Sequence, residues 1–349
     1  MATATGIYRT TYEGDLAIKQ TRADWARLGV LAVVLVAIPF LASPYWLTVI
    51  NMIGIAAIGA IGLNILTGFT GQISLGQGGF LGVGAYTAAL LSMHAGVPFP
   101  FTLIAAMAMT AAVGVLFGLP SLRLKGLYLA IATLAAQFVI LWVIRNWEPV
   151  TGGTESLALQ PVELLGVTLH GDFTWYWIIL LFAVLATVTA MNLFRTGLGR
   201  AFIAIRDQDI AAEVMGVSPL RFKLTSFAIS SAYVGLAGAL IAHYRLIVTW
   251  ERFTFDISIQ YLAMIIVGGL GSVLGAILGA ALITALPAVL QRAGGTVSEV
   301  VPQFQQQLPA IEITLFGLII VLFLVFEPRG LARIWQRMKD YFRLWPFRY

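Results

Sequence analysis

Cysteine is absent from the sequence, and only four lysines and three histidines occur among its 349 residues. Without cysteine the chain forms no disulfide and offers no thiolate nucleophile or zinc ligand. No lysine follows a glycine, so the glycine-rich loop whose lysine reaches nucleotide phosphates is also missing. His94, His170 and His243 lack the His-Glu-x-x-His spacing of a zinc protease. We therefore expect no catalytic site, no metal and no ATP hydrolysis in this chain.

Charged residues are also scarce, at 11% of the chain against about 25% in soluble domains, while 59% of the residues are apolar. The mean hydropathy is +0.90. Because this composition does not provide a water-exposed surface, the sequence predicts a membrane protein. At about 20 residues per helical span, the apolar residues are enough for about ten spans. The net charge of +5 is then better explained by orientation in the bilayer than by nucleic-acid binding.

Ten apolar runs predict an all-α, polytopic membrane protein with eight to ten transmembrane segments. The runs cover residues 28–49, 50–66, 78–93, 99–120, 126–144, 173–193, 220–246, 257–270, 273–290 and 310–326. Two places interrupt them: the glycine-rich segment 67–77, and Gly271 with Ser272. Each is a candidate for a broken or re-entrant helix, which needs protein or a water-filled path to satisfy its backbone.

The distribution of basic residues predicts the orientation of the chain, because short loops rich in lysine and arginine face the cytoplasm. Arg123 and Lys125 mark one such loop, whereas segments 247–256 and 291–309 contain few basic residues and are expected outside. Both termini are then cytoplasmic, so the number of spans is even. The predicted parts are a cytoplasmic tail (1–27), a transmembrane domain (28–326) with a cytoplasmic loop (194–223) and a periplasmic loop (145–172), and a basic cytoplasmic tail (327–349).

Acidic residues lie outside the middle of the apolar runs. Glu13, Asp15 and Asp24 precede the first run without a small-residue cleavage pattern, so residues 1–27 are expected to be a tail and not a signal peptide. Proton-coupled transporters usually carry ionisable groups inside their spans. Because no carboxylate is mid-span here, we expect any energy coupling to occur on another subunit.

Residues 67–86 read TGFTGQISLGQGGFLGVGAY, a glycine density that disfavours a regular helix. Gly78 and Gly82 have the spacing of close helix packing, and the polar residues could instead belong to a broken helix that contacts a passing solute. Both interpretations stay open, and they are compatible. The polar candidates for a translocation path are Asn64, Gln72, Ser74 and Gln77. In IIVGGLGSVLGAILGAAL (265–282), Gly271, Gly275 and Gly279 are expected on one helix face for packing.

The segment GRAFIAIRDQDIAAEVMGVSPLRFKLTSF, which begins at Gly199, predicts a short amphipathic helix on the cytoplasmic loop. Its apolar stripe is Ile203, Ile210 and Val214. Asp207 or Asp209 can begin the helix and Gly216 can end it, and Ser218 with Pro219 begins the next helix. Such a helix either lies on lipid headgroups or docks into a groove of a soluble partner.

These stretches, together with KGLYLAIATLA, VTGGTESL and FEPRGLA, occur in the order found in one family. The sequence resembles the LivM-type permease subunits of ABC importers for branched-chain amino acids, over about residues 50–332. In related permeases a coupling helix begins Glu-Ala-Ala and has a glycine four residues after the second alanine. Ala211, Ala212 and Gly216 match that pattern, whereas Ile210 occupies the position of the glutamate and the acidic residues are at Asp209 and Glu213. The resemblance thus implies a coupling loop that includes Gly199, Arg200, Asp207, Asp209, Ile210, Ala211, Ala212, Glu213 and Gly216.

The resemblance also implies partners, a location and a substrate class. The implied partners are a second, LivH-type permease, two ATPase subunits of LivG and LivF type that bind the ATP, a periplasmic solute-binding protein and the lipid bilayer, with no nucleic acid. The implied location is the bacterial inner membrane, and no cofactor is expected in this chain. Branched-chain amino acids are the implied solutes, with urea, short amides and aromatic acids as alternatives. A stand-alone uniporter or channel is the alternative class, and an intramembrane enzyme is a more distant one.

Overall fold

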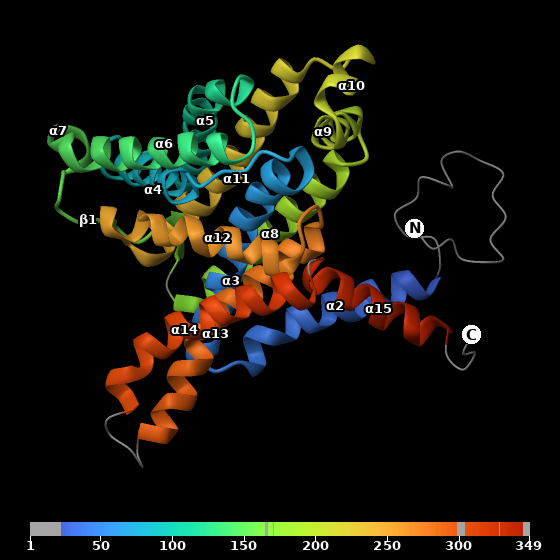
Figure 1. Cartoon of the computed structure of the whole chain (residues 1–349). Coiled ribbons are helices and arrows are strands. Elements are labelled where there is room, and N and C mark those ends of the chain that lie inside the picture. Colours follow the sequence, from blue (N-terminus) through green and yellow to red (C-terminus); the bar gives the residue numbers. More distant parts are fainter. Residues whose placement is uncertain (1–21, 165–166, 170, 299–303, 328, 345–349) are drawn as a thin grey trace. The chain divides into compact units, whose positions relative to one another are not determined.

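The computed structural model describes residues 22–164, 167–169, 171–298, 304–327 and 329–344. The chain divides into two compact units, residues 1–47 and residues 48–349. Most of the described chain is helical, so the predicted all-α class is confirmed (Figure 1). Of the predicted tails 1–27 and 327–349, residues 1–21, 328 and 345–349 lie outside the described residues. The first unit contains α2 (Arg22–Leu41) and the first turn of α3.

The second unit contains the other helices and four short strands. The longer helices are α3 (Pro44–Asn64), α4 (Gln77–His94), α5 (Phe99–Gly118), α6 (Leu127–Asn146), α8 (Gly171–Leu193), α9 (Gly197–Asp207), α11 (Pro219–Arg245), α12 (Phe255–Gly268), α13 (Val273–Ser298), α14 (Phe304–Phe326) and α15 (Gly330–Leu344). The short ones are η1 (Ile65–Phe69), η2 (Leu119–Leu122), α7 (Glu148–Thr151), α10 (Asp209–Val214) and η3 (Trp250–Phe253).

Six helices in the described part of the chain are long and apolar enough to cross a membrane, or seven if α14 and α15 form one bent span. The predicted count of eight to ten is therefore not confirmed. One boundary was wrong: the predicted division between residues 49 and 50 falls inside α3, which begins at Pro44 because proline suits the first turn of a helix. Another apolar run forms α12, which has only 14 residues.

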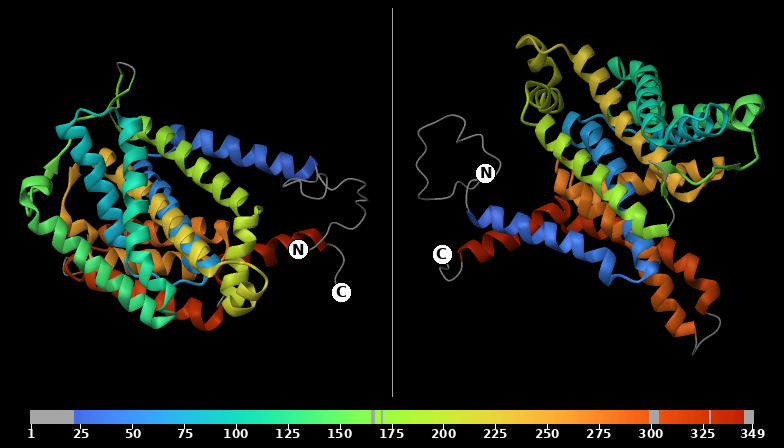
Figure 2. Two further views of the ribbon diagram at one scale, coloured as in Figure 1. Left: turned by 90° about the horizontal axis from the view of Figure 1, so that it is seen from above. Right: turned by 180° about the vertical axis from the view of Figure 1, so that it is seen from behind.

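The core of the second unit is formed around α11, which packs against α4 and α5 (Figure 2). Small residues permit this packing. A Cβ atom on Gly235 would lie 2.7 Å from the Cβ of Thr110, and one on Gly84 would lie 2.6 Å from the Cα of Gly235. Without a hydrophobic driving force between helices in lipid, such close backbone approach supplies much of the association energy.

Two interruptions of helical backbone lie where the glycine-rich sequence predicted them. The first break (residues 65–76) consists of the π-helix η1 and a non-helical stretch in which Gly71 has a φ of 72°. The second break (residues 269–272) separates α12 from α13, and Gly269 and Gly271 have φ values of 121° and 73°. Positive φ values favour glycine because it has no Cβ atom.

Two short antiparallel ladders lie in the segments that the charge pattern placed outside. Strand β1 (Leu157–Ala158) pairs with β4 (Ile247–Val248), with Leu157 opposite Val248. Strands β2 (Glu163–Leu164) and β3 (Val167–Thr168) form a hairpin. The β1–β4 pair joins the loop before α8 to the segment after α11, so these two segments lie at the same end of the second unit.

Candidate functional site

Asn64 joins the two helix breaks. Its Oδ1 accepts a hydrogen bond from the backbone N–H of Gly271 at 2.9 Å, and its Nδ2 donates to the carbonyl oxygen of Ser272 at 2.8 Å. The side chain is 1% exposed. Asn64 therefore satisfies the N–H of Gly271, which lies in the non-helical second break, and adds a second hydrogen bond to the carbonyl oxygen of Ser272, which also accepts from the N–H of Ala276 at 3.0 Å.

Arg206, in the last turn of α9, joins the same two breaks to the loop 194–223. Its Nη1 donates to the carbonyl oxygen of Gly68 at 3.1 Å, and its guanidinium pairs with Asp207 at 3.0 Å. The side-chain stem passes over Gly71, where a Cβ atom would lie 2.9 Å from the Cγ of Arg206. A Cβ on Gly271 would lie 3.3 Å from Nη1. Gly71 and Gly271 therefore make room for this arginine, whereas the missing Cβ of Gly68 makes room for the side chain of Asn64 and the backbone of Gly271.

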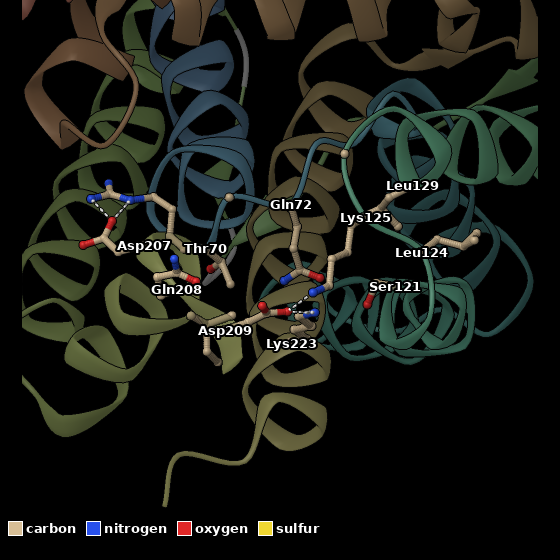
Figure 3. A pocket seen from close by; sticks show the side chains of 14 residues that line it. Thr70, Gln72, Ser121, Leu124, Lys125, Leu129, Asp207, Gln208, Asp209 and Lys223 are labelled. Atoms are coloured by element: carbon tan, nitrogen blue, oxygen red, sulfur yellow. Dashed lines mark hydrogen bonds and ion pairs between the residues drawn. The ribbon is translucent and has the colours of Figure 1, made fainter. Parts of the chain in front are cut away.

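An ion-pair cluster of Asp209, Lys125 and Lys223 joins the beginning of α10 to the segment before α6 and to the first turns of α11. The carboxylate of Asp209 lies 2.5 Å from the ammonium nitrogen of Lys125 and 3.5 Å from that of Lys223 (Figure 3). Lys125 precedes α6, and the nearly buried Lys223 lies in the first turns of α11. All three residues belong to segments that the sequence placed inside, so the cluster brings together parts of the chain that the charge pattern assigned to one side.

Hydrogen bonding to Lys125 lowers the pKa of the Asp209 carboxyl, and Coulombic attraction to both lysines adds to this shift. A carboxyl whose pKa is lower in the folded protein stabilises the fold above its ordinary pKa of about 3.9, and that stabilisation is lost as the pH falls through the lowered value. Asp209 therefore stays ionised at neutral and mildly acidic pH, and the cluster is not a switch in that range.

A cavity of about 190 Å³ lies between the loop and the first break. Its polar lining includes Gln72, Ser121 and the Asp209 cluster (Figure 3). The Nε2 of Gln72 donates to the Ser226 hydroxyl at 2.7 Å. Within the described part of the chain, the Oε1 of Gln72 and the hydroxyl of Ser121 have no hydrogen-bond partner although both are buried. Unpaired buried polar atoms are costly, so this cavity is suited to a polar occupant.

The loop differs from the predicted single helix. It forms α9 and α10, separated by Gln208, whose φ of −160° and ψ of 98° are extended. The expected continuous stripe of Ile203, Ile210 and Val214 is therefore wrong, because Ile203 lies on α9 and the other two lie on α10. The extended residue redirects the chain so that Asp209 reaches its lysine partners.

Gly216 ends α10 in the left-handed conformation that its position predicted. Its φ is 85°, its N–H donates to the carbonyl oxygen of Glu213 at 2.9 Å, and the N–H of Val217 donates to that of Ala212 at 2.9 Å. Helices commonly end in this way at glycine. Ser218 and Pro219 then begin α11 as expected, although the Ser218 side chain makes no capping hydrogen bond.

The outer face of α10 is apolar and exposed. Ile210 is 68% exposed, Val214 81% and Met215 83%, whereas Ala212 is buried toward the chain. Ala211 and Glu213 are exposed as well. Contiguous exposed apolar side chains in a loop of a membrane protein are suited to lipid or to a protein partner.

The remaining predicted loop residues lie where α9 begins. Gly199 packs against the end of α8, where a Cβ atom would lie 2.6 Å from the carbonyl oxygen of Leu193. Arg200 is exposed and donates weakly, at 3.3 Å, to the carbonyl oxygen of Arg195. Nearby, the rings of Phe69 and Phe194 stack with centroids 3.4 Å apart, which adds an apolar contact between the first break and the beginning of the loop.

The four polar residues proposed from sequence for a solute path are all buried, but they do not share one cavity. Of the four, only Gln72 lines the cavity described above. Asn64 is engaged by the second break. Ser74 accepts from the N–H of Gly76 at 3.4 Å, and Gln77 donates to the carbonyl oxygen of Gly59 at 3.4 Å. A role in solute passage stays a prediction for all four.

The glycines proposed for packing divide into two groups. A Cβ on Gly78 would lie 2.7 Å from the carbonyl oxygen of Thr254, and one on Gly82 would lie 3.2 Å from the ring of Phe253. Gly275 and Gly279 lie against the backbone of α12. The expectation that Gly271 shares their helix face is wrong, because Gly271 precedes α13 and has a positive φ in the second break.

Sequence reasoning did not single out Arg206, Lys223 or Gln137 as site residues. Gln137 is fully buried in α6, where its Oε1 accepts from the N–H of Gly79 at 2.6 Å and its Nε2 donates to the carbonyl oxygen of Phe253 at 2.7 Å. The sequence did contain a signal for Gln137, which is a single amide within an apolar run. Such a side chain must find hydrogen-bond partners within the protein. Arg206 and Lys223 were hidden among the other basic residues of the loop.

These features define a multi-pass helical membrane protein in which a loop is fastened to two interrupted helices. The family model described as the permease component of branched-chain amino acid transport systems matches residues 45–324. The chain belongs to this family, whose members are non-catalytic components of transporters.

Curated relatives agree with the family. The chain is 34% identical over 325 residues to the high-affinity branched-chain amino acid transport system permease protein LivM of Salmonella typhimurium and to that of Escherichia coli, covering 86% of this chain and 73% of each relative. A probable LivM protein of Methanocaldococcus jannaschii is 27% identical over 46% of this chain and 47% of its own length. No solved structure matches the chain.

Proposed function

We propose that this chain is the permease subunit of an ABC importer and forms half of a translocation pathway for branched-chain amino acids or a related small solute. The names of its relatives support the substrate class. A LivH-type permease would form the other half, LivG-type and LivF-type ATPases would bind the ATP, and a periplasmic binding protein would deliver the solute. The location would be a bacterial inner membrane.

The observation that carries the coupling role is the hydrogen bond from Arg206 to Gly68. Through it, α9 is attached to the first break, and Asn64 attaches the first break to the second. Packed elements transmit displacement when their contacts are specific and few arrangements are allowed. An ATPase that moves α10 would therefore move Arg206 and change the backbone of both breaks together.

The outer face of α10 is the proposed ATPase contact. At the N-terminal end of α10, the ion pairs of Asp209 with Lys125 and Lys223 fix the position of the helix. Ile210 and Val214 offer an apolar ridge of the kind that docks into a groove. Ala211 and Gly216 flank or end this ridge at positions that match the family pattern, and Glu213, which that pattern does not include, lies beside them. Ala212 faces inward and fixes α10 to the chain.

Two contacts support the proposed orientation with cytoplasmic termini. The β1–β4 pair joins two segments assigned outside by their few basic residues. The Asp209 cluster joins segments assigned inside. If each of the ten apolar runs crosses the membrane, α12 enters from outside and the second break lies on the cytoplasmic side, where Arg206 meets Gly271.

Reconstitution separates this proposal from a stand-alone uniporter or channel. We expect liposomes that hold this chain with both ATPases and the second permease to accumulate labelled leucine only with loaded binding protein and internal ATP. Liposomes that hold this chain alone should show no leucine equilibration and no ATP turnover. Equilibration by the single chain at rates comparable to the complex would refute the subunit assignment.

A further inference from the structure

Helix α15 is amphipathic along its described length. Within residues 330–341, its large apolar residues are Leu331, Ile334, Trp335, Met338 and Tyr341. At 100° per residue these positions fall on one face, and Arg333, Gln336, Arg337, Lys339 and Asp340 fall on the opposite face. Residues 329–343 contain five basic residues and one acidic residue. A surface helix of a soluble protein would bury such an apolar face.

The outer part of that apolar face has a large solvent-exposed fraction. Trp335 is 52% exposed, Met338 48% and Tyr341 55%. Among the residues of α15 whose burial is described (330–341), the buried ones are Gly330 and Ala332, at the beginning of the helix. The helix follows α14 after a bend of 55°, so it does not continue the direction of the preceding apolar helix.

The orientation of α15 is fixed at its base. Gly330 has a φ of 67°, and a Cβ atom there would lie 2.6 Å from the carbonyl oxygen of Val267 and from the N–H nitrogen of Gly269. The carboxylate of Glu327 accepts a hydrogen bond from Arg337 at 2.7 Å and lies 3.7 Å from Arg333. Since both arginines are on the polar face, these contacts hold that face toward Glu327 and leave the apolar face outward.

We propose that α15 is an interfacial helix that binds the anionic surface of the bilayer, with Trp335, Met338 and Tyr341 inserted at the headgroup boundary. Tryptophan and tyrosine favour that depth because their rings are amphipathic. The excess of basic residues complements anionic headgroups. Gly330, at the beginning of α15, packs against the backbone of Gly269 in the second break. A helix that binds lipid is therefore in direct contact with the second break. Under the proposed orientation, the leaflet that α15 contacts is the cytoplasmic one. This assignment of the leaflet is the only part of the inference that rests on the proposed function.

The natural absence of cysteine makes a direct test possible. Met338→Cys and Gln336→Cys place a single spin label on the apolar face and on the polar face of the same helix, and both native side chains are exposed. The full chain is reconstituted in nanodiscs of phosphatidylcholine with phosphatidylglycerol, and collision rates are measured with oxygen, which concentrates in lipid, and with a water-soluble nickel chelate. We expect the label at 338 to favour oxygen severalfold and the label at 336 to favour nickel. The contrast should fall when the anionic lipid is omitted.

Three results would overturn the proposal. Equal access of nickel to both labels would show that α15 lies in water. Shielding of the label at 338 from both reagents once the ATPases are present would show a protein contact instead of lipid. A contrast that is unchanged without anionic lipid would remove the role of the basic residues. None of these results depends on transport, so the outcome is independent of the test of the proposed function.

Discussion

Arg206→Ala is expected to lower solute-stimulated ATP hydrolysis and leucine uptake by about 10- to 100-fold in the assembled transporter, while the chain still inserts and assembles. The substitution removes the hydrogen bond to Gly68 and the stem that covers Gly71. A hydrogen bond to a charged group contributes about 1.5–3 kcal/mol, and about 1.4 kcal/mol corresponds to a factor of ten in an equilibrium. Without this hydrogen bond, we expect the loop to move without displacing the backbone of the two breaks, so that ATP hydrolysis is no longer coupled to transport.

Arg221→Ala is the matched control for this experiment. It removes the same charge from an exposed position at the beginning of α11, on the same predicted side of the membrane. We expect uptake near the unmodified level. ATPase binding should be retained in both variants, because α10 is unchanged. Normal coupling in Arg206→Ala at equal assembly would mean that the Arg206–Gly68 contact does not transmit motion.

Gly279→Ala is expected to destabilise the chain strongly, although it adds only one methyl group. The new Cβ would overlap the carbonyl oxygen of Met264 and lie 3.0 Å from the Cα of Gly268. Overpacking typically costs about 1–3 kcal/mol, and backbone atoms yield less readily than a side-chain end. We expect a lower midpoint of thermal unfolding in detergent and a lower yield of folded protein.

Gly317→Ala provides the comparison, because it makes the same change in α14 where no atom lies within 4 Å of the added Cβ. Alanine favours a helix over glycine by about 1 kcal/mol, so this variant should be unchanged or slightly more stable. The expected outcome is a lowered midpoint for Gly279→Ala and an unchanged or raised midpoint for Gly317→Ala. Equal midpoints would contradict the close approach of α12 and α13.

The class of fold and the positions of the breaks were predictable because they depend on local chemistry. Apolar runs about as long as a helical span indicate membrane helices whatever their partners are. Glycine density indicated the first break, and Gly271 with Ser272 indicated the second. Gly216 was recognised because a single residue with positive φ is enough to end a helix.

The joining of these parts was not predictable, because it depends on residues far apart in the sequence. Arg206 and Gly68 are separated by 138 positions, and nothing in either local pattern indicates the other. Lys125 and Asp209 were both noted for their charge, but charge alone does not select partners among the basic residues of the chain. The split of α9 from α10 at Gln208 follows from that tertiary pairing.

The central claim is that α10 contacts an ATPase subunit, and Val214→Cys tests it most directly. Val214 is 81% exposed, and the added thiol would be the only one in this chain. A short thiol-to-amine cross-linker applied to the assembled importer should join this chain to an ATPase in a yield that changes with ATP. Ile247, just after the other end of α11, is 49% exposed. The variant Ile247→Cys should give no such product. Absence of an ATPase adduct at 214, with the thiol in contact with lipid in every nucleotide state, would contradict the account.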